Sequence, residues 1–155
     1  MNDFIEIPLK GHTAIIDASD AHVLKENWYA IVRKSGYVHV LNSKQSLARR
    51  IMQAPKGMVV DHINRDTLDN RRSNLRLCTV AENSRNRKGY GKFPHKGLAL
   101  TESGRWVAQI IVNRKYYRLG TYDSMEKAAL MYDVAAKAYH GAFARINFPN
   151  ACTSG

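Results

Sequence analysis

A basic stretch in the middle of the sequence limits what this chain can fold into. From Arg85 to Lys96 there are five Lys or Arg side chains and no acidic one. Gly89, Gly91 and Pro94 interrupt the same stretch. Gly and Pro favour turns and connections, and a run of like charge does not pack into a core. We therefore expect two separate modules joined by a linker over residues 88–95.

The charge of the chain predicts a polyanionic partner. Its 155 residues include 24 Lys or Arg and 13 Asp or Glu, a formal net charge of +11. The excess is greatest in residues 61–96, which carry nine basic and four acidic side chains. Such a segment is typical of a solvated linker and equally of a surface that contacts a phosphate backbone. Nucleic acid is the first partner to consider.

Composition excludes several other classes of protein. Apolar residues make up 45% of the chain, which predicts packed cores rather than disorder. The longest apolar runs are far shorter than a membrane span, and no signal-peptide pattern is visible at the N-terminus. Two cysteines, Cys78 and Cys152, are too few for a disulfide framework or a four-thiolate zinc site. We expect a soluble, cytoplasmic protein that is not secreted.

Residues 1–60 predict a mixture of short elements. Strands are expected over 4–9, 13–17, 28–32 and 37–41, and Lys34-Ser35-Gly36 should form a hairpin turn between the last two. Asp20 is expected to cap a brief helix that runs to Glu26. Another one or two helical turns are expected over residues 46–52.

Residues 58–87 have the order strand, loop, strand, helix. A β-branched run leads into Asp61 and His62, and a polar loop extends to Asn74. Apolar and polar residues then alternate up to Thr79, as in a half-buried strand. Thr79 and Glu82 have the spacing of a capping box, which predicts the start of a helix.

The last sixty residues predict a three-stranded antiparallel sheet covered by one helix. The strands are expected over 97–100, 105–112 and 115–119. A capping-box pattern from Asp123 to Glu126 predicts a helix that runs to about His140 and ends at Gly141. The whole chain is therefore expected to be an α+β protein.

Asp61, His62, Asn74 and Asn83 are the groups that metal-assisted phosphodiester hydrolysis requires. Asp and Asn oxygens bind hard divalent cations, and a neutral His can accept a proton from water. The same residue types are also common in structural loops. Neighbours on a regular strand point to opposite faces, so Asp61 and His62 share one face only if the backbone is irregular there.

The segment from Val60 to Asn83 resembles the HNH homing endonucleases of phages and introns, which are ββα-metal nucleases. The resemblance rests on Val60-Asp61-His62-Ile63-Asn64, on Leu68-Asp69-Asn70-Arg71-Arg72-Ser73-Asn74-Leu75-Arg76, and on Thr79 with Glu82-Asn83. It implies that His62 is the general base and that Asp61 and Asn83 hold one Mg²⁺, with Mn²⁺ as an alternative. It also implies that Asn74 orients His62 or stabilises the loop. Neither zinc nor a small-molecule cofactor is expected.

The C-terminal segment resembles the Apetala/ethylene-response-factor (ERF) DNA-binding domain. The matching residues are Lys96-Gly97, Gly104-Arg105-Trp106, Leu119-Gly120-Thr121-Tyr122, Glu126 to Ala129, Tyr132-Asp133, Ala135-Ala136 and Ile146-Asn147-Phe148-Pro149. That family lays its sheet in the major groove of DNA. We therefore expect an HNH nuclease domain over residues 1–87, with its core motif at 58–87, and an ERF-type domain over residues 96–150.

Contacts with double-stranded DNA are predicted from both modules. Around the HNH motif and linker they are expected from Arg71, Arg72, Arg76, Arg85, Arg87, Lys88 and Lys96. On the polar face of the C-terminal sheet they are expected from Arg105, Gln109, Tyr116 and Arg118. A solvated sheet face would carry similar residues.

Four positions depart from the family patterns. Arg65 stands where the HNH family usually has Gly, and Ala48 stands where a His is common. Ala99 and Thr101 replace base-contacting arginines of the plant ERF domains, which implies a different or weaker sequence preference.

The sequence favours a phage or intron endonuclease that nicks DNA as a monomer with a divalent metal. The main alternative is a catalytically degenerate HNH/ERF protein that acts as a sequence-specific DNA-binding regulator. Binding to structured RNA is a third possibility that the charge allows, but no RNA-binding module supports it.

Overall fold

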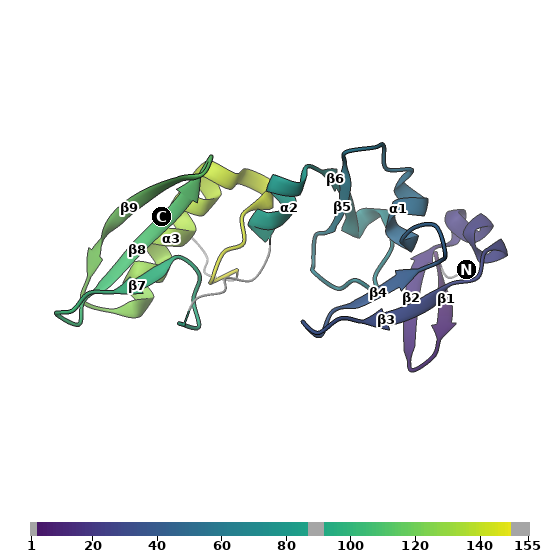
Figure 1. The fold of residues 1–155 in the computed structure, drawn as a ribbon, viewed down its shortest axis with the longest axis horizontal. Helices are drawn as coiled ribbons and strands as arrows, with labels where there is room; N and C mark the ends of the chain where they lie inside the picture. The colour runs from purple at the N-terminus through teal and green to yellow at the C-terminus, as the bar shows by residue number, and fades with distance from the viewer. Residues whose placement is uncertain (1–2, 87–91, 150–155) are drawn as a thin grey trace. The chain divides into compact units, whose positions relative to one another are not determined.

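A computed structural model of the chain describes residues 3–86 and 92–149, so Arg87, Lys88 and half of the expected linker lie outside the described residues. The chain divides into two compact units, Met1–Asn83 and Ser84–Gly155 (Figure 1). Each unit mixes helices with small antiparallel sheets, which confirms the expected mixture of helix and strand. No helix within the described ranges is long and apolar enough to cross a membrane.

The first unit contains three antiparallel strand pairs. They are β1 (Phe4–Leu9) with β2 (His12–Asp17), β3 (Tyr29–Val32) with β4 (Val38–Leu41), and β5 (Val59–His62) with β6 (Leu75–Cys78). Between them lie the 3-10 helix η1 (Ala18–Lys25), the helix α1 (Leu47–Met52) and the short 3-10 turn η2 (Arg72–Asn74). The helix α2 (Val80–Asn86) follows β6 and crosses the boundary between the two units.

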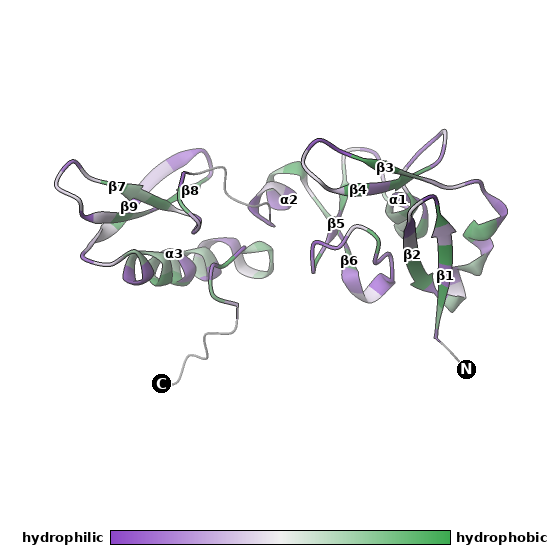
Figure 2. Ribbon diagram, turned by 90° about the horizontal axis from the view of Figure 1, so that it is seen from below, coloured by the Kyte–Doolittle hydropathy of each residue, from purple (hydrophilic) through white to green (hydrophobic). Residues whose placement is uncertain are grey.

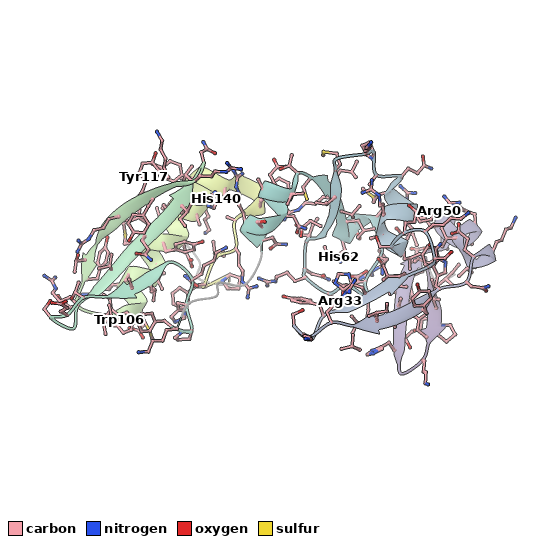
Figure 3. All side chains as sticks on the ribbon, viewed as in Figure 1. Arg33, Arg50, His62, Trp106, Tyr117 and His140 are labelled. Carbon is pink, nitrogen blue, oxygen red and sulfur yellow. The ribbon has the colours of Figure 1, made fainter. Side chains whose placement is uncertain are left out.

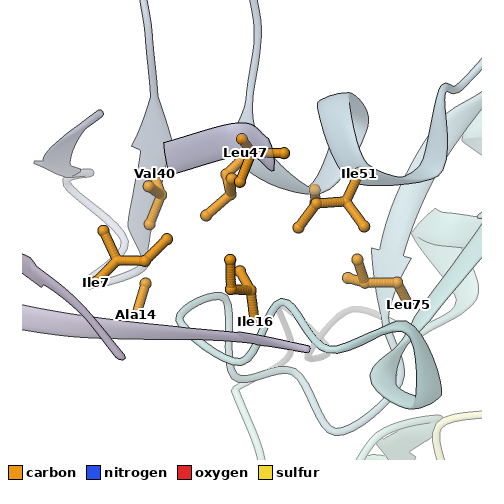
Figure 4. Close-up of a cluster of buried hydrophobic side chains, with 9 residues drawn as sticks. Ile7, Ala14, Ile16, Val40, Leu47, Ile51 and Leu75 are labelled. Atoms are coloured by element: carbon orange, nitrogen blue, oxygen red, sulfur yellow. The ribbon is translucent and has the colours of Figure 1, made fainter. Parts of the chain in front are cut away.

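One aliphatic core holds the first unit together (Figure 4). Its buried members are Ile7, Ala14, Ile16, Val23, Val40, Leu47, Ala48, Ile51 and Leu75. Leu47 and Ile51 lie one helical turn apart on α1, and burying such a side chain stabilises a fold by roughly 1.5–3 kcal/mol. Because α1 packs against both β5 and β6, this core fixes the hairpin β5–β6, whose first strand ends at His62.

Asp20 is not the helix cap that the sequence predicts. The helix η1 begins at Ala18, after Asp17, and contains Asp20 within it. Asp20 is buried and accepts hydrogen bonds from Arg72 Nε and Nη2 at 2.9 and 2.8 Å. The Asp20 carboxylate, predicted from local sequence to cap a helix, instead binds Arg72, which lies 52 residues away.

The second unit is the expected three-stranded sheet with one helix. β7 (Leu98–Leu100), β8 (Trp106–Val112) and β9 (Lys115–Tyr122) pair in that order, and α3 (Met125–His140) lies along one face (Figure 1). Hydrophobic and hydrophilic residues are interleaved along α3 (Figure 2). Its buried face carries Ala128, Ala129, Tyr132, Ala135 and Ala136. The 3-10 turn η3 (Gly141–Phe143) follows the helix.

Candidate functional site

The hairpin β5–β6 positions the candidate site. Asp61 pairs with Arg76 and His62 pairs with Leu75 in a continuous antiparallel register. Asp61 and His62 are the last two residues of β5, and the charge of Asp61 opposes the lowering of the His62 pKa by burial. His62 lines a pocket of the first unit together with Val59 and Val60.

Asn70 holds the imidazole of His62. His62 Nε2 lies 3.2 Å from Asn70 Oδ1. The amide nitrogen of Asn70 donates to the carbonyl oxygens of Thr67 and Leu68, at 3.2 and 3.1 Å, so its orientation is fixed. Since Oδ1 can only accept, Nε2 of His62 must carry the hydrogen. In the neutral ring, Nδ1 is then the basic nitrogen.

Burial lowers the pKa of His62, and the hydrogen bond from His62 to Asn70, with the carboxylates of Asp61, Asp66 and Asp69, partly opposes this. The imidazole is therefore neutral near pH 7, with a lone pair on Nδ1. That is the state in which a general base accepts a proton.

Asn74 braces the loop instead of contacting His62. Its side-chain nitrogen donates to the carbonyl oxygen of Asp69 at 2.8 Å, and its side-chain oxygen accepts from the backbone N–H of Asn64 at 2.9 Å. Of the two functions that the HNH resemblance implied for Asn74, these contacts serve the loop. Asn70 is not among the candidate groups predicted from the sequence, although it lies within the HNH motif.

Asp61 forms a partly buried ion pair. Its Oδ2 accepts from Nε and Nη2 of Arg76 at 2.8 and 2.6 Å, and Asp61 itself is only 5% exposed. Charge-assisted, two-point contacts of this kind fix both side chains. Arg76, an expected DNA contact, thus lies against the expected metal ligand.

Arg71 and Arg72 also hold carboxylates of the first unit. Arg71 binds Asp69 through Nε and Nη2, each at 2.8 Å, and Arg72 binds Asp20. The pairing with Arg71 keeps the pKa of Asp69 below its usual value. Both arginines are partly exposed, so their outer edges face solvent while their charges are paired.

Oxygen ligands for a hard cation are present on the hairpin and on α2. Asp61 supplies a carboxylate and Asn83, in α2, supplies a side-chain amide. These donors suit Mg²⁺ or Mn²⁺. Within residues 3–86 and 92–149, no group of three His, Cys, Asp or Glu side chains comes together.

Arg65 adopts the backbone conformation that favours glycine. Its φ is +70°, and its backbone N–H donates to the carbonyl oxygen of His62 at 2.9 Å. A side chain in this left-handed region costs roughly 1–2 kcal/mol. The turn after His62 is therefore made here despite the absence of Gly.

The outer face of the second sheet carries the other predicted DNA contacts. Gln109 pairs with Arg118, and Ile111 pairs with Tyr116, so these side chains share a face. The hydroxyl of Tyr116 donates to Gln109 Oε1, and Arg118 Nη2 donates to Thr121 Oγ1 at 2.6 Å.

The other predicted contacts of this unit lie at the start of β8 and near α2. Arg105 is exposed, and its Nη2 lies 3.0 Å from Oδ1 of Asp123. The ammonium group of Lys96 instead donates to the carbonyl oxygen of Arg85 at 2.8 Å. Burial lowers the pKa of Lys96 to about 8.

Comparisons with known proteins match both parts of the chain. The family profile described as HNH endonuclease matches residues 53–85, and that of the AP2 domain matches residues 95–142. An uncharacterised HNH endonuclease of Acanthamoeba polyphaga mimivirus is 32% identical over 132 residues, a match that covers 81% of this chain and 68% of the relative.

Plant proteins match a shorter part of the chain. An AP2/ERF and B3 domain-containing protein of Oryza sativa subsp. japonica is 45% identical over 60 residues, which cover 39% of this chain and 16% of that protein. An ethylene-responsive transcription factor of Arabidopsis thaliana is 48% identical over 68 residues, covering 41% and 37%. The chain thus spans well under half the length of either plant protein.

Proposed function

This chain belongs to the HNH endonuclease family and carries an AP2 domain, and we propose that it hydrolyses phosphodiester bonds of double-stranded DNA with His62 as general base. The observation that carries the proposal is the fixed imidazole of His62. Its Nε2 is held by Asn70, which leaves Nδ1 as the basic nitrogen. The HNH and AP2 domains both imply DNA binding.

In the proposed reaction, His62 Nδ1 takes a proton from a water molecule as the water oxygen bonds to phosphorus. The bond between phosphorus and the 3′ oxygen breaks, and that oxygen gains a proton from solvent. The products are a 5′-phosphate and a 3′-hydroxyl. General base catalysis by a positioned side chain contributes on the order of 10²–10⁴-fold in rate.

Asp61 and Asn83 are the proposed ligands of one divalent ion, Mg²⁺ or Mn²⁺. When bound, the ion supplies positive charge for the phosphate and the leaving oxygen. Arg76 holds the Asp61 carboxylate in place through its two contacts. Arg105, Gln109, Tyr116 and Arg118 are proposed to contact DNA from the second unit.

We further propose that the protein acts as a monomeric nickase of a phage or intron, in the cytoplasm of a bacterial host cell. A single HNH motif per chain acts most simply on one strand. The relative from a virus supports the mobile-element origin.

Cleavage of supercoiled plasmid DNA tests the proposed activity. Wild-type protein with Mg²⁺ or Mn²⁺ is expected to convert the plasmid to open circles, and His62→Ala or added EDTA is expected to prevent this. His22→Ala, which alters an exposed histidine of the same unit, is the matched control and should retain activity. Linear product from the wild type would contradict the monomeric nickase.

The Asp61–Arg76 ion pair favours one alternative, a DNA-binding regulator without nuclease activity, because it engages the expected metal ligand. That alternative predicts salt-sensitive binding to duplex DNA, with no strand breakage by the wild type even on DNA from the host element. Open circles that depend on His62 would exclude it.

A further inference from the structure

A second histidine lines the pocket that contains His62. The pocket has a volume of about 300 Å³ and lies entirely within the first unit. Its polar wall residues are His39, Ser46, Arg49, His62, Thr67 and Asn70. His39 comes from β4, whereas His62 comes from the end of β5, so two separate strand pairs bring an imidazole to the same space.

The neighbouring polar groups of this pocket are already engaged by the protein. Arg49 donates to the carbonyl oxygens of Ala54, Pro55 and Met58. Thr67 Oγ1 donates to the carbonyl oxygen of Val38, and Ser46 Oγ accepts from the backbone of Arg49. These contacts hold the pocket walls in position.

His39 differs from these residues. No described residue forms a hydrogen bond with either ring nitrogen of His39. The imidazole of His39 is half-buried in the pocket, so its donor is available to a ligand that enters there.

The surroundings of His39 suit an anion. Burial lowers the pKa of His39, and the positive charge of Arg33 lowers it further. Arg33 follows β3 on the same hairpin, and Figure 3 shows it on the side of the unit where His62 lies. The guanidinium of Arg33 is exposed and has no ion-pair partner among the described residues. A neutral imidazole with one N–H, within the electrostatic influence of the exposed Arg33 guanidinium, matches a phosphate oxygen.

We propose that His39 is a second catalytic residue, which donates a hydrogen bond from its ring N–H to a non-bridging oxygen of the scissile phosphate opposite His62. This inference rests on the proposed nuclease function and adds a residue to it. A donor placed in advance stabilises the charge that develops on the phosphate, and removing one such donor typically costs about a hundredfold in rate.

Two measurements on the full chain test the proposal. In the first, thymidine 5′-monophosphate serves as a phosphate probe that needs no recognition sequence, and imidazole resonances are followed by NMR. The His39 resonances are expected to shift saturably, those of exposed His22 are expected to stay in place, and Arg33→Ala is expected to weaken the response. Unmoved His39 resonances would overturn direct contact with phosphate.

In the second measurement, single-turnover nicking is compared for wild type, His39→Ala, His39→Gln and the control His22→Ala. His39→Ala is expected to slow nicking by about a hundredfold with unchanged affinity for duplex DNA. His39→Gln keeps an N–H donor and should recover part of the rate, which also separates lost catalysis from misfolding. Normal nicking by His39→Ala would overturn the proposal while the nuclease function stood.

The two measurements together separate this proposal from the proposed function. If wild type does not nick DNA but its His39 resonances respond to the nucleotide, the phosphate site stands and the nuclease function fails. If nicking depends on His39 but its resonances do not respond, His39 acts through His62 and direct contact is wrong.

Discussion

At the scale of single residues, the first unit depends on polar contacts that fix the direction of side chains. Asn70 donates to two backbone carbonyls, and this leaves its side-chain oxygen to hold His62. Arg76 fixes Asp61 in the same hairpin. Each contact removes rotamer freedom from a side chain that the proposed reaction uses.

His140 gives a pH-dependent prediction for the second unit. It is 8% exposed, no described residue forms a hydrogen bond with its Nδ1, and burial followed by the charge of Arg85 lowers its pKa. Below pH 6.5, His140 binds a proton more readily in the unfolded chain than in the folded unit. The free energy of unfolding is therefore highest above pH 6.5 and decreases as the pH falls below it. We expect His140→Gln to reduce this loss between pH 7.5 and 5.5.

Thermal unfolding followed by Trp106 fluorescence in a Trp28→Phe background measures the effect on the second unit alone, because the chain has two tryptophans. His22→Gln, a change in the first unit, should leave the pH dependence at Trp106 unaltered. The same loss of stability in His140→Gln and wild type would show that another group is responsible.

At the scale of elements, helix starts follow local capping, although not always at the expected residue. The backbone N–H of Thr79 donates to Glu82 Oε2 at 2.8 Å, and that of Glu82 donates to Thr79 Oγ1 at 3.2 Å, which confirms the capping box of α2. In α3 the cap is Ser124, one residue after Asp123, and its hydroxyl accepts from the backbone of Lys127. Ser and Asp are comparable caps, so spacing alone does not choose between adjacent candidates.

Gly97 and Gly104 give a matched pair of predictions for the sheet of the second unit. Both have positive φ, +79° and +78°. A Cβ on Gly97 would lie 1.9 Å from Tyr132 Cδ2, whereas a Cβ on Gly104 meets nothing within 4 Å. Gly104→Ala is expected to cost about 1–2 kcal/mol from backbone strain alone. Gly97→Ala should cost roughly 1–3 kcal/mol more, because Tyr132 must move out of its packing.

Urea unfolding of the two variants, followed at Trp106, measures this difference in the free energy of unfolding. The close approach of β7 to α3 is the reason that Gly is needed at position 97. Equal losses for the two variants would mean that backbone conformation alone requires Gly there.

At the scale of the whole molecule, the net charge of +11 does not show which basic side chains are available to DNA. Arg71, Arg72 and Arg76 pair with carboxylates of the first unit, so their formal charge overstates what they offer to DNA. Arg118 on the second sheet has a hydroxyl partner instead of an acidic one. We therefore expect the second sheet to contribute strongly to the salt dependence of binding.

Salt titrations of duplex binding test this expectation. If Arg118 contacts a phosphate, Arg118→Ala is expected to make the negative slope of log K against log salt shallower by about one. Lys137→Ala removes one charge from an exposed position of α3, which covers the other face of the sheet, and should change the slope less. Fluorescence anisotropy of a labelled duplex across NaCl concentrations gives both slopes. Equal changes would indicate binding through overall charge rather than through the sheet.

The sequence by itself determined the elements and the set of candidate groups. Strand alternation, turn residues and capping boxes predicted the hairpin β5–β6, the three-stranded sheet and the helices α2 and α3, because these signals act between residues a few positions apart. The spacing of Asp61, His62, Asn74 and Asn83 identified candidate groups, but it did not show where their side chains point.

Only the tertiary structure decided which groups meet. The choice of Asn70 over Asn74 as the partner of His62 depends on how the loop folds back on its own carbonyls and on β2. The pairing of Arg72 with Asp20 joins residues 52 positions apart, and the meeting of His39 with His62 requires two strand pairs to pack around one core. Contacts of this kind leave no local period in the sequence, because they are set by the packing of whole elements.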